Sequence, residues 1–357
     1  MSSTWGNKIK ISIFGGSHTQ AIGVVIDGLP AGEAIDMDEI LCQMARRAPG
    51  KDKSSTPRKE SDTPNILSGL LDGVLTGAPL AAVIENTNTR SRDYSELKIH
   101  PRPGHSDYPA SVRYQGANDI RGGGHFSGRL TACIVFAGAV CRQILRRRGV
   151  VIGGHVLSVG EVQDAPFDPV EVTSQELESL SGRYFPVRTA GTENAMREVI
   201  EEARLSLDSV GGVVECVVTG MPAGIGSPMF GGVENVLASI LYGIPAVKGV
   251  EFGDGFGVAK LRGSENNDAF YYDESGAVKT RTNHAGGILG GITTGMPIVF
   301  RVAVKPTPSI AREQETVDLR TGETAKLRVQ GRHDPCIVPR AVPVVESAAA
   351  IALLDMM

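Results

Sequence analysis

Some segments of this chain repeat apolar residues every three to four positions, which predicts helices, and others are short runs of apolar residues, which predict strands. Asp36 with Glu39 three positions later is a typical capping pair for the start of a helix. Ile40, Leu41 and Met44 then follow a helical spacing, and the Ala-Pro-Gly of residues 48–50 predicts where the helix ends. The same spacing predicts further helices at about 130–148, 193–206, 233–241 and 342–354.

Segments rich in β-branched residues, bounded by glycine or proline, predict strands at 9–14, 23–28, 151–162, 212–218 and 298–304. Strands and helices do not alternate strictly, so we expect an α+β architecture with mainly antiparallel sheet. The polar, charged stretch 51–65 predicts a mobile surface loop. Because no clean linker or tandem repeat divides the chain, we expect residues 1–357 to form a single domain.

Composition narrows the class of protein. Hydrophobic residues make up 41% of the chain, which is enough for a sizeable core. The five cysteines are odd in number and form no CxxC pair, which argues against a disulfide framework or a zinc site. The N-terminus has no basic-then-apolar signal pattern, and the nearly apolar run 131–141 is too short to cross a bilayer. We therefore expect a soluble, cytoplasmic protein with no membrane partner.

Positive charge gathers in one segment, residues 100–129, although the chain has a formal net charge of -4. It holds Arg102, Arg113, Arg121 and Arg129 together with a triple glycine at 122–124. Glycine lets backbone N–H groups approach a phosphate or a planar ring. A local cluster favours a small, highly charged substrate over nucleic acid, because the overall charge is negative and only 5% of residues are aromatic. The alternative is a solvated loop with incidental arginines.

Histidines near this segment are candidates for proton transfer. His18 follows Ser17 at the end of a predicted strand, and His105 follows a Pro-Gly turn, so together they could protonate two different atoms. No GxSxG surrounds Ser17, which argues against a hydrolase. His125 directly follows the triple glycine and could contact a bound anion or ring. Metal binding is the competing interpretation, but no histidine pair has helical ligand spacing.

A third cluster lies toward the C-terminus. The Lys-Pro-Thr-Pro-Ser of residues 305–309 could close a phosphate site with a lysine and two hydroxyls. Arg332 and Asp334 flank a histidine in the Gly-Arg-His-Asp-Pro of 331–335, and 283–291 is another glycine-dense loop. None of these loops fits a GxGxxG or Walker A pattern in the required context, so a Rossmann or P-loop site is not predicted.

In this order, these segments resemble the chorismate synthase family over nearly the whole chain. The resemblance is carried by FGGSHTQAIGVVIDGLPAG, NTNTRSRDYSE, RPGHSDY, DIRGGGHFSGRLTA, NHAGGILGGITTG, KPTPSI and GRHDPCIVPRAVPVVE. It implies a β-α-β sandwich with antiparallel sheets flanking a helical layer, assembled as a homotetramer. It also implies conversion of 5-enolpyruvylshikimate 3-phosphate to chorismate and phosphate by a 1,4-elimination, the last common step of aromatic amino-acid biosynthesis. Reduced FMN is implied as cofactor, without net redox change.

The resemblance also assigns roles. His18 is similar to the family's acid that assists the departing phosphate, and His105 to the residue that sets the protonation state of the reduced flavin. Asp334 resembles the carboxylate beside the flavin N5, and Ser17 and Ser127 match serines of the same site. Implied FMN contacts are His125, Phe126, Ser127, Pro245, Ala246, Gly290, Lys305, Pro306, Thr307, Pro308, Ser309 and Arg332. Implied substrate or NADP contacts are Arg47, Lys53 and Arg129. Whether the chain uses NADPH to reduce its own flavin stays open.

The chain departs from the family pattern at several positions. Gly16 stands where the family usually has glutamate, and Ala48, His125 and Phe126 stand where it usually has Arg, Arg and Ser. Loss of fixed guanidinium groups at 48 and 125 predicts weaker anion binding. Two hypotheses follow: an active chorismate synthase, and a catalytically impaired homologue that binds flavin or anions.

Overall fold

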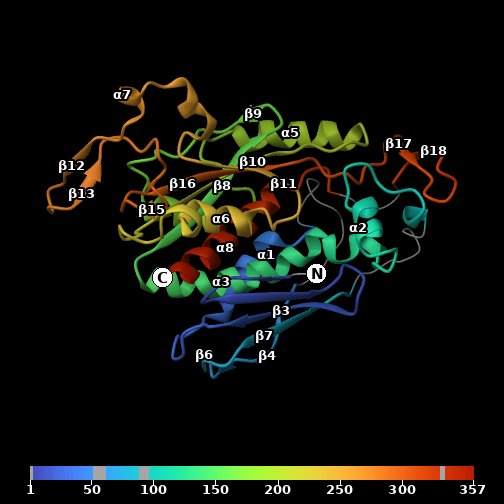
Figure 1. Ribbon diagram of the computed structural model, residues 1–357, viewed down its shortest axis with the longest axis horizontal. Coiled ribbons are helices and arrows are strands. Elements are labelled where there is room, and N and C mark those ends of the chain that lie inside the picture. Colours follow the sequence, from blue (N-terminus) through green and yellow to red (C-terminus); the bar gives the residue numbers. More distant parts are fainter. Residues whose placement is uncertain (1–2, 51–61, 88–95, 330–333) are drawn as a thin grey trace.

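The computed structural model describes residues 3–50, 62–87, 96–329 and 334–357, and it arranges them in three layers (Figure 1). A layer of helices lies between two five-stranded sheets, and all neighbouring strands in both sheets run antiparallel. This arrangement confirms the predicted α+β class and the β-α-β sandwich.

The first sheet has the strand order β1-β2-β3-β7-β4. Along β7, the alternate residues Leu80, Ala82 and Ile84 are buried, because successive side chains of a strand point to opposite faces. The strands are Thr4–Trp5 (β1), Lys10–Gly15 (β2), Ala21–Asp27 (β3), Asn65–Ser68 (β4) and Leu80–Glu85 (β7).

The second sheet has the order β11-β16-β10-β8-β9. The predicted strand at 151–162 is in fact two strands, because the chain turns back between them at Gly160, whose φ is 55°. The strands are Val151–Val159 (β8), Val162–Gln163 (β9), Gly212–Thr219 (β10), Val247–Phe252 (β11) and Ile298–Val304 (β16).

Four helices form the middle layer: Met37–Arg47 (α1), Thr131–Arg147 (α3), Val233–Leu241 (α6) and Val338–Met356 (α8). α3 and α8 pack so closely that a Cβ placed on Gly138 would overlap the Cα of Ser347. One hydrophobic cluster joins this layer to both sheets, with Ile26, Phe136 and Phe300 among its buried members. The segment Gly128–Arg147 is long and apolar enough to cross a membrane, but 89% of its apolar window is buried, as expected of a core helix.

The segment between β1 and β2 contacts the C-terminal end of α8. The Asp355 carboxylate accepts hydrogen bonds from the backbone N–H groups of Asn7 at 2.9 Å and Ile9 at 2.7 Å. This contact fastens the C-terminal end of α8 to the first sheet.

Shorter elements complete the fold. Ser174–Ser181 (α4) and Thr192–Leu205 (α5) pack against the second sheet. At one end of the sandwich lie Glu96–Lys98 (η2), Asp107–Arg113 (α2), Arg121–Phe126 (η3), Gly128–Leu130 (η4), Gln314–Val317 (β17) and Thr324–Leu327 (β18). The remaining elements are Leu70–Leu71 (β5), Val74–Leu75 (β6), Met229–Gly231 (η5), Gly255–Lys260 (η6), Gly263–Asn266 (α7), Phe270–Tyr272 (β12), Val278–Thr280 (β13), Ile288–Leu289 (β14) and Ile292–Thr293 (β15).

The predicted start of the first helix is confirmed, because the Asp36 carboxylate accepts hydrogen bonds from the backbone N–H groups of Asp38 and Glu39. The last helix begins earlier than predicted, at Val338, since Pro339 fits the first turn of a helix. The predicted loop at 51–65 is partly wrong, because Asn65 begins β4; residues 51–61 lie outside the described residues. The hydrophobic pattern did not predict α2, α4, β4, β7 or β11.

Candidate active site

The triple glycine lies between the two candidate acids. A Cβ placed on Gly122 would overlap His18 Nδ1, and one placed on Gly123 would lie 3.2 Å from His105 Nε2. The three glycines also have positive φ values of 61°, 83° and 53°, which other residues rarely adopt. His18 and His105, far apart in the sequence, therefore contact the same short backbone segment, and side chains there would push them away.

The turn after β2 holds His18. The backbone N–H of Ser17 donates to the Gly124 carbonyl at 3.0 Å, and Ser17 Oγ lies 3.2 Å from His18 Nδ1. Asn86 closes the turn from the other side, since its Nδ2 donates to the carbonyls of Gly16 at 3.0 Å and Thr19 at 2.8 Å. His18 is only 8% exposed as a residue, so this geometry fixes a nearly buried imidazole beside a hydroxyl.

His105 is held by a second set of contacts. It lies in the turn that leads into α2, and its Nδ1 is 2.6 Å from Asp107 Oδ1. Arg102 donates hydrogen bonds to the same carboxylate from Nε at 2.7 Å and from Nη2 at 2.8 Å. Its Nη1 donates to Ser309 Oγ at 3.0 Å. Burial by itself would raise the pKa of Asp107, but the hydrogen bonds from Arg102 and His105 outweigh it and hold the pKa well below its usual value. Asp107 is therefore ionised at neutral pH.

Two predicted anion-binding residues, Arg47 and Arg129, meet at one carboxylate. Asp62 accepts from Arg47 Nη1 at 2.5 Å and from Arg129 Nη1. Burial lowers the pKa of Arg47 to about 10, while Asp62 opposes that change. Burial would raise the pKa of Asp62, yet the two guanidiniums lower it overall. Arg129 also donates through Nε to Asn86 Oδ1 at 3.0 Å, which links the arginines to the His18 turn.

Asp334 joins the same cluster. Arg340, in the first turns of α8, donates through Nη1 to Asp334 at 2.7 Å and through Nε to the Arg47 carbonyl at 2.9 Å. The predicted flavin-side carboxylate therefore lies on the same connected network as the two predicted anion-binding arginines.

The predicted phosphate segment 305–309 lies against the His105 turn. Lys305 Nζ donates to the Gly104 carbonyl, and the Lys305 backbone N–H donates to the Ala246 carbonyl at 3.0 Å. Ala246, which follows Pro245 in the turn before β11, has a φ of 77°. The buried hydroxyl oxygen of Thr307 has no hydrogen-bond partner among the described residues. The segment therefore offers a hydroxyl for a ligand.

The remaining predicted residues lie in varied surroundings. Ser127 Oγ accepts from the Arg129 N–H at 3.2 Å, and Phe126 packs at 6.4 Å from the ring of Tyr114. The two ring nitrogens of His125 lie 2.8 Å from the Gly15 carbonyl and 2.6 Å from Ser3 Oγ. Gly290, in the β14–β15 turn, is not brought to this cluster by any contact within the described ranges. Lys53 and Arg332 lie outside the described residues.

Sequence reasoning missed Asp62, Asn86 and Asp107 as members of this site, and it named Arg102 only as part of the positive segment 100–129. Asp107 carried a usable signal, because a carboxylate two positions after a candidate acid is well placed to orient it. Asp62 carried none, since it lies within a polar stretch that predicts a loop.

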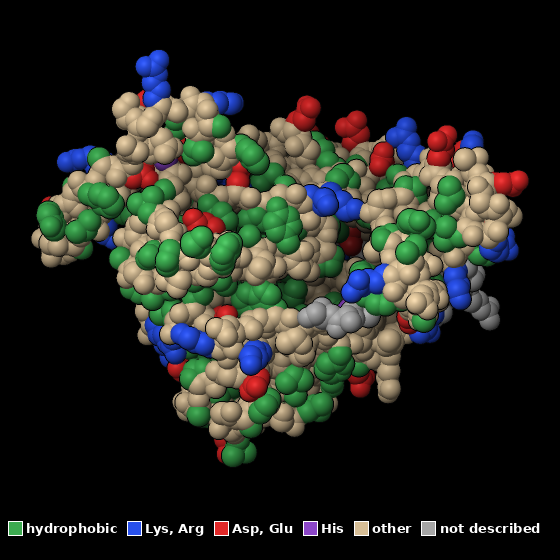
Figure 2. Space-filling model, in the orientation of Figure 1, with side chains coloured by type: hydrophobic (Ala, Val, Ile, Leu, Met, Phe, Trp, Pro, Cys, Tyr) green, Lys and Arg blue, Asp and Glu red, His purple; other side chains and the backbone are tan. Residues whose placement is uncertain are grey.

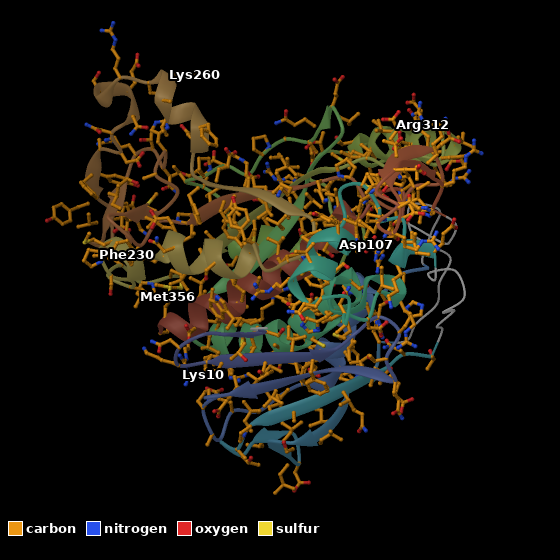
Figure 3. All side chains as sticks on the ribbon, turned by 45° about the vertical axis from the view of Figure 1, so that its right-hand side comes forward. Lys10, Asp107, Phe230, Lys260, Arg312 and Met356 are labelled. Atoms are coloured by element: carbon orange, nitrogen blue, oxygen red, sulfur yellow. The ribbon has the colours of Figure 1, made fainter. Side chains whose placement is uncertain are left out.

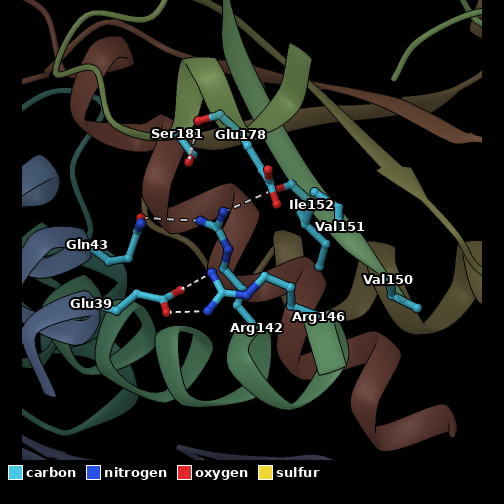
Figure 4. Close-up of a pocket in the computed structure, with 9 residues that line it drawn as sticks. All are labelled: Glu39, Gln43, Arg142, Arg146, Val150, Val151, Ile152, Glu178 and Ser181. Atoms are coloured by element: carbon cyan, nitrogen blue, oxygen red, sulfur yellow. Dashed lines mark hydrogen bonds and ion pairs between the residues drawn. The ribbon is translucent and has the colours of Figure 1, made fainter. Parts of the chain in front are cut away.

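A pocket of about 50 Å³ lies elsewhere in the molecule, between α1, α3, α4 and β8 (Figure 4). Its arginines are already compensated: Arg146 donates to Glu39 at 2.7 and 3.1 Å, and Arg142 donates to Gln43 at 3.2 Å and to the buried Glu346 at 2.8 Å. None of the residues that line this pocket is a histidine or another predicted site residue, so the site between His18 and His105 stays the candidate active site.

Comparisons with known proteins identify the family of this chain. A sequence model of the family "Chorismate synthase" matches residues 9–357. A chorismate synthase of Lancefieldella parvula is 46% identical over 366 residues, covering 99% of this chain and 96% of that protein. One of Thermococcus kodakarensis is 47% identical over 350 residues, covering 98% and 96%. A solved structure titled "Crystal Structure of Chorismate Synthase" matches with a TM-score of 0.76 at 28% identity, covering 99% of this chain and 92% of that one.

Proposed function

This chain belongs to the chorismate synthase family, and we infer from that membership that it is a carbon-oxygen lyase acting on a phosphate ester. Its reaction is the 1,4-elimination of phosphate from 5-enolpyruvylshikimate 3-phosphate to give chorismate, in aromatic amino-acid biosynthesis. The observation that carries this function is the glycine segment 122–124, which both His18 and His105 contact.

Different residues of the site donate the proton and bind the substrate in the elimination. His18 donates a proton to the phosphate oxygen as the C–O bond breaks, with Ser17 Oγ beside its Nδ1. Arg47 and Arg129 hold the phosphate and carboxylates of the substrate, each charge-assisted contact contributing about 1.5–3 kcal/mol. The nearly buried position of His18 excludes water from the leaving group.

We propose reduced FMN as the cofactor. The residues near His105 fit a phosphorylated planar group, because Thr307 has an unsatisfied buried hydroxyl and a Cβ on Gly122 or Gly123 would crowd the imidazoles. Lys305, Thr307 and Ser309 would hold the cofactor. Asp334, which accepts a hydrogen bond from Arg340, would lie beside it. When bound, the reduced flavin supplies the transient electron donation that cleavage of an unactivated C–O bond requires. His105 would hold or release a proton beside it.

The surface supports assembly into the homotetramer that the resemblance implies. Large hydrophobic side chains are exposed on η5, η6 and β12: Met229 at 76%, Phe230 at 86%, Phe256 at 88%, Phe270 at 63% and Tyr272 at 77%. Figure 2 shows hydrophobic side chains gathered at that end of the molecule. Patches of this kind mark protein–protein contacts. We propose that copies of this chain cover them, and that the assembly works in the cytoplasm with each chain folded as one domain.

The test is an anaerobic assay with chemically reduced FMN that follows phosphate release and chorismate formation together. Formation of both products supports the proposal. Repeating the assay with NADPH in place of the chemical reductant shows whether the chain reduces its own flavin. Flavin binding without turnover would overturn it and select the impaired homologue. His18→Ala is expected to lower kcat by about 10²- to 10⁴-fold while substrate binding changes little.

A further inference from the structure

We infer that Asp107 is a positioning residue that fixes which nitrogen of His105 faces the ligand. Together with Arg102 it forms a buried unit that orients the imidazole before any ligand arrives. The role of His105 in proton transfer rests on the proposed function. The orientation of its imidazole does not, because it follows from contacts within the chain.

The proton on His105 can be placed from its neighbours. Asp107 is ionised, so its oxygens only accept hydrogen bonds, and a separation of 2.6 Å from Oδ1 requires that Nδ1 carries the hydrogen. Arg102 Nη2 also lies 3.1 Å from Nδ1, but a guanidinium has no acceptor and cannot replace the carboxylate as the partner of an N–H. In the neutral imidazole, Nε2 is therefore the nitrogen with the lone pair.

This free nitrogen faces the glycine segment. Nε2 is the atom of His105 nearest to the position of a Cβ on Gly123, at 3.2 Å. The imidazole therefore presents Nε2 to the same backbone that contacts His18, where a proton can be accepted from a ligand or returned to it. The opposite tautomer would present an N–H there and lose the Asp107 contact.

The carboxylate that sets this orientation has no freedom to turn away. Asp107 Oδ2 accepts from the Arg102 backbone N–H at 3.0 Å and from its Nε at 2.7 Å, while Oδ1 accepts from Nη2 and from His105. The side chains of Asp107 and Arg102 are 2% and 4% exposed. Figure 3 labels Asp107 on α2, far from Phe230 at the other end of the molecule.

The same unit ties His105 to the proposed cofactor segment. Arg102 Nη1 donates to Ser309 Oγ, and Lys305 Nζ donates to the carbonyl of Gly104, the residue before His105. Within the described chain, Arg102, Asp107 and Lys305 are the charged groups that these contacts bring to the His105 turn. The unit therefore fixes the imidazole relative to residues 305–309 as well as relative to the glycines.

The test compares Asp107→Asn with a matched control. The side-chain amide that this substitution introduces can donate to Nδ1 of His105 and so favours the tautomer with the hydrogen on Nε2. We expect kcat to fall roughly 10²- to 10⁴-fold, as when a histidine is left in the wrong tautomer, with little change in KM. Asp107→Glu should recover part of kcat. The control, Asp164→Asn, removes another carboxylate beside a buried histidine, His155, and should leave kcat unchanged.

Two further measurements make the outcome decisive. In the double variant Asp107→Asn with His105→Ala, the losses in kcat should not add if Asp107 acts through His105; additive losses would overturn the inference. Nitrogen-15 spectra of histidine-labelled protein should show hydrogen on Nδ1 of His105 in the wild type and on Nε2 in Asp107→Asn. Hydrogen on Nε2 in the wild type would overturn the inference even in a protein without turnover, whereas absent turnover with the expected spectra would overturn only the proposed function.

Discussion

Replacing Asp62 by asparagine tests how far Arg47 and Arg129, the arginines proposed to bind anions, depend on an internal counter-ion. The Asp62 side chain is fully buried, and those of Arg47 and Arg129 are 5% and 4% exposed. The variant keeps the shape of the side chain but removes the carboxylate that both buried guanidiniums contact. Removing one partner of a buried ion pair costs about 3–5 kcal/mol, so the free energy of unfolding should fall by that amount.

The substitution should not strain the backbone at residue 62, so a change in stability reports on the lost carboxylate. Asp62 has a φ of 50°, a left-handed conformation that asparagine and glycine both tolerate. Urea unfolding, followed by the fluorescence of Trp5 at fixed protein concentration, gives the stability. Asp208→Asn is the control, because its pair with Arg312 is exposed and such pairs contribute at most about 1 kcal/mol.

Chemical rescue separates charge from packing. In Asp62→Gly, acetate can take the place of the missing carboxylate, and at about one hundred times its dissociation constant it should restore about 2.7 kcal/mol. The wild type should gain much less from acetate, because its own carboxylate occupies the position. Equal stability of Asp62→Asn and the wild type, or equal rescue of Asp62→Gly and the wild type by acetate, would refute the reasoning.

Three other predictions follow from the geometry. Gly122→Ala should abolish most turnover while costing only about 1–2 kcal/mol in backbone strain, because its Cβ would displace His18; unchanged kcat contradicts this. The lowered pKa values of Asp62 and Asp107 contribute stability above the unfolded aspartate pKa near ~3.9, so urea midpoints should drop as the pH falls below about 4, and less in Asp62→Asn. Phe256→Ser should weaken assembly in sedimentation experiments without loss of helicity; an unchanged oligomer contradicts the proposed interface.

The sequence predicted those parts of the fold that short-range patterns determine. The segment around Asp36 predicted α1 because capping and helical spacing act within one or two turns. β7 was missed because Leu80–Glu85 is nearly all apolar, and such a short run does not separate strand from helix.

The site was predicted in its residue types but not in its connections. His18 and His105 were selected from their turns and from the family resemblance, and the structure places both against the glycines. The shared use of Asp62 by Arg47 and Arg129 depends on three segments meeting in space. No spacing along the chain encodes such a meeting, because it follows from how the first sheet and the helices pack.

The position of α8 in the middle layer has a consequence for biosynthesis. Every strand of both sheets precedes residue 338 in the chain, so the ribosome makes both sheets before it makes the helix that lies between them. Until then, the inner faces of the sheets have no complete partner, and exposed apolar surface of this kind attracts chaperones and promotes aggregation. A nascent chain of this protein must therefore wait for its last core element before the sandwich can close.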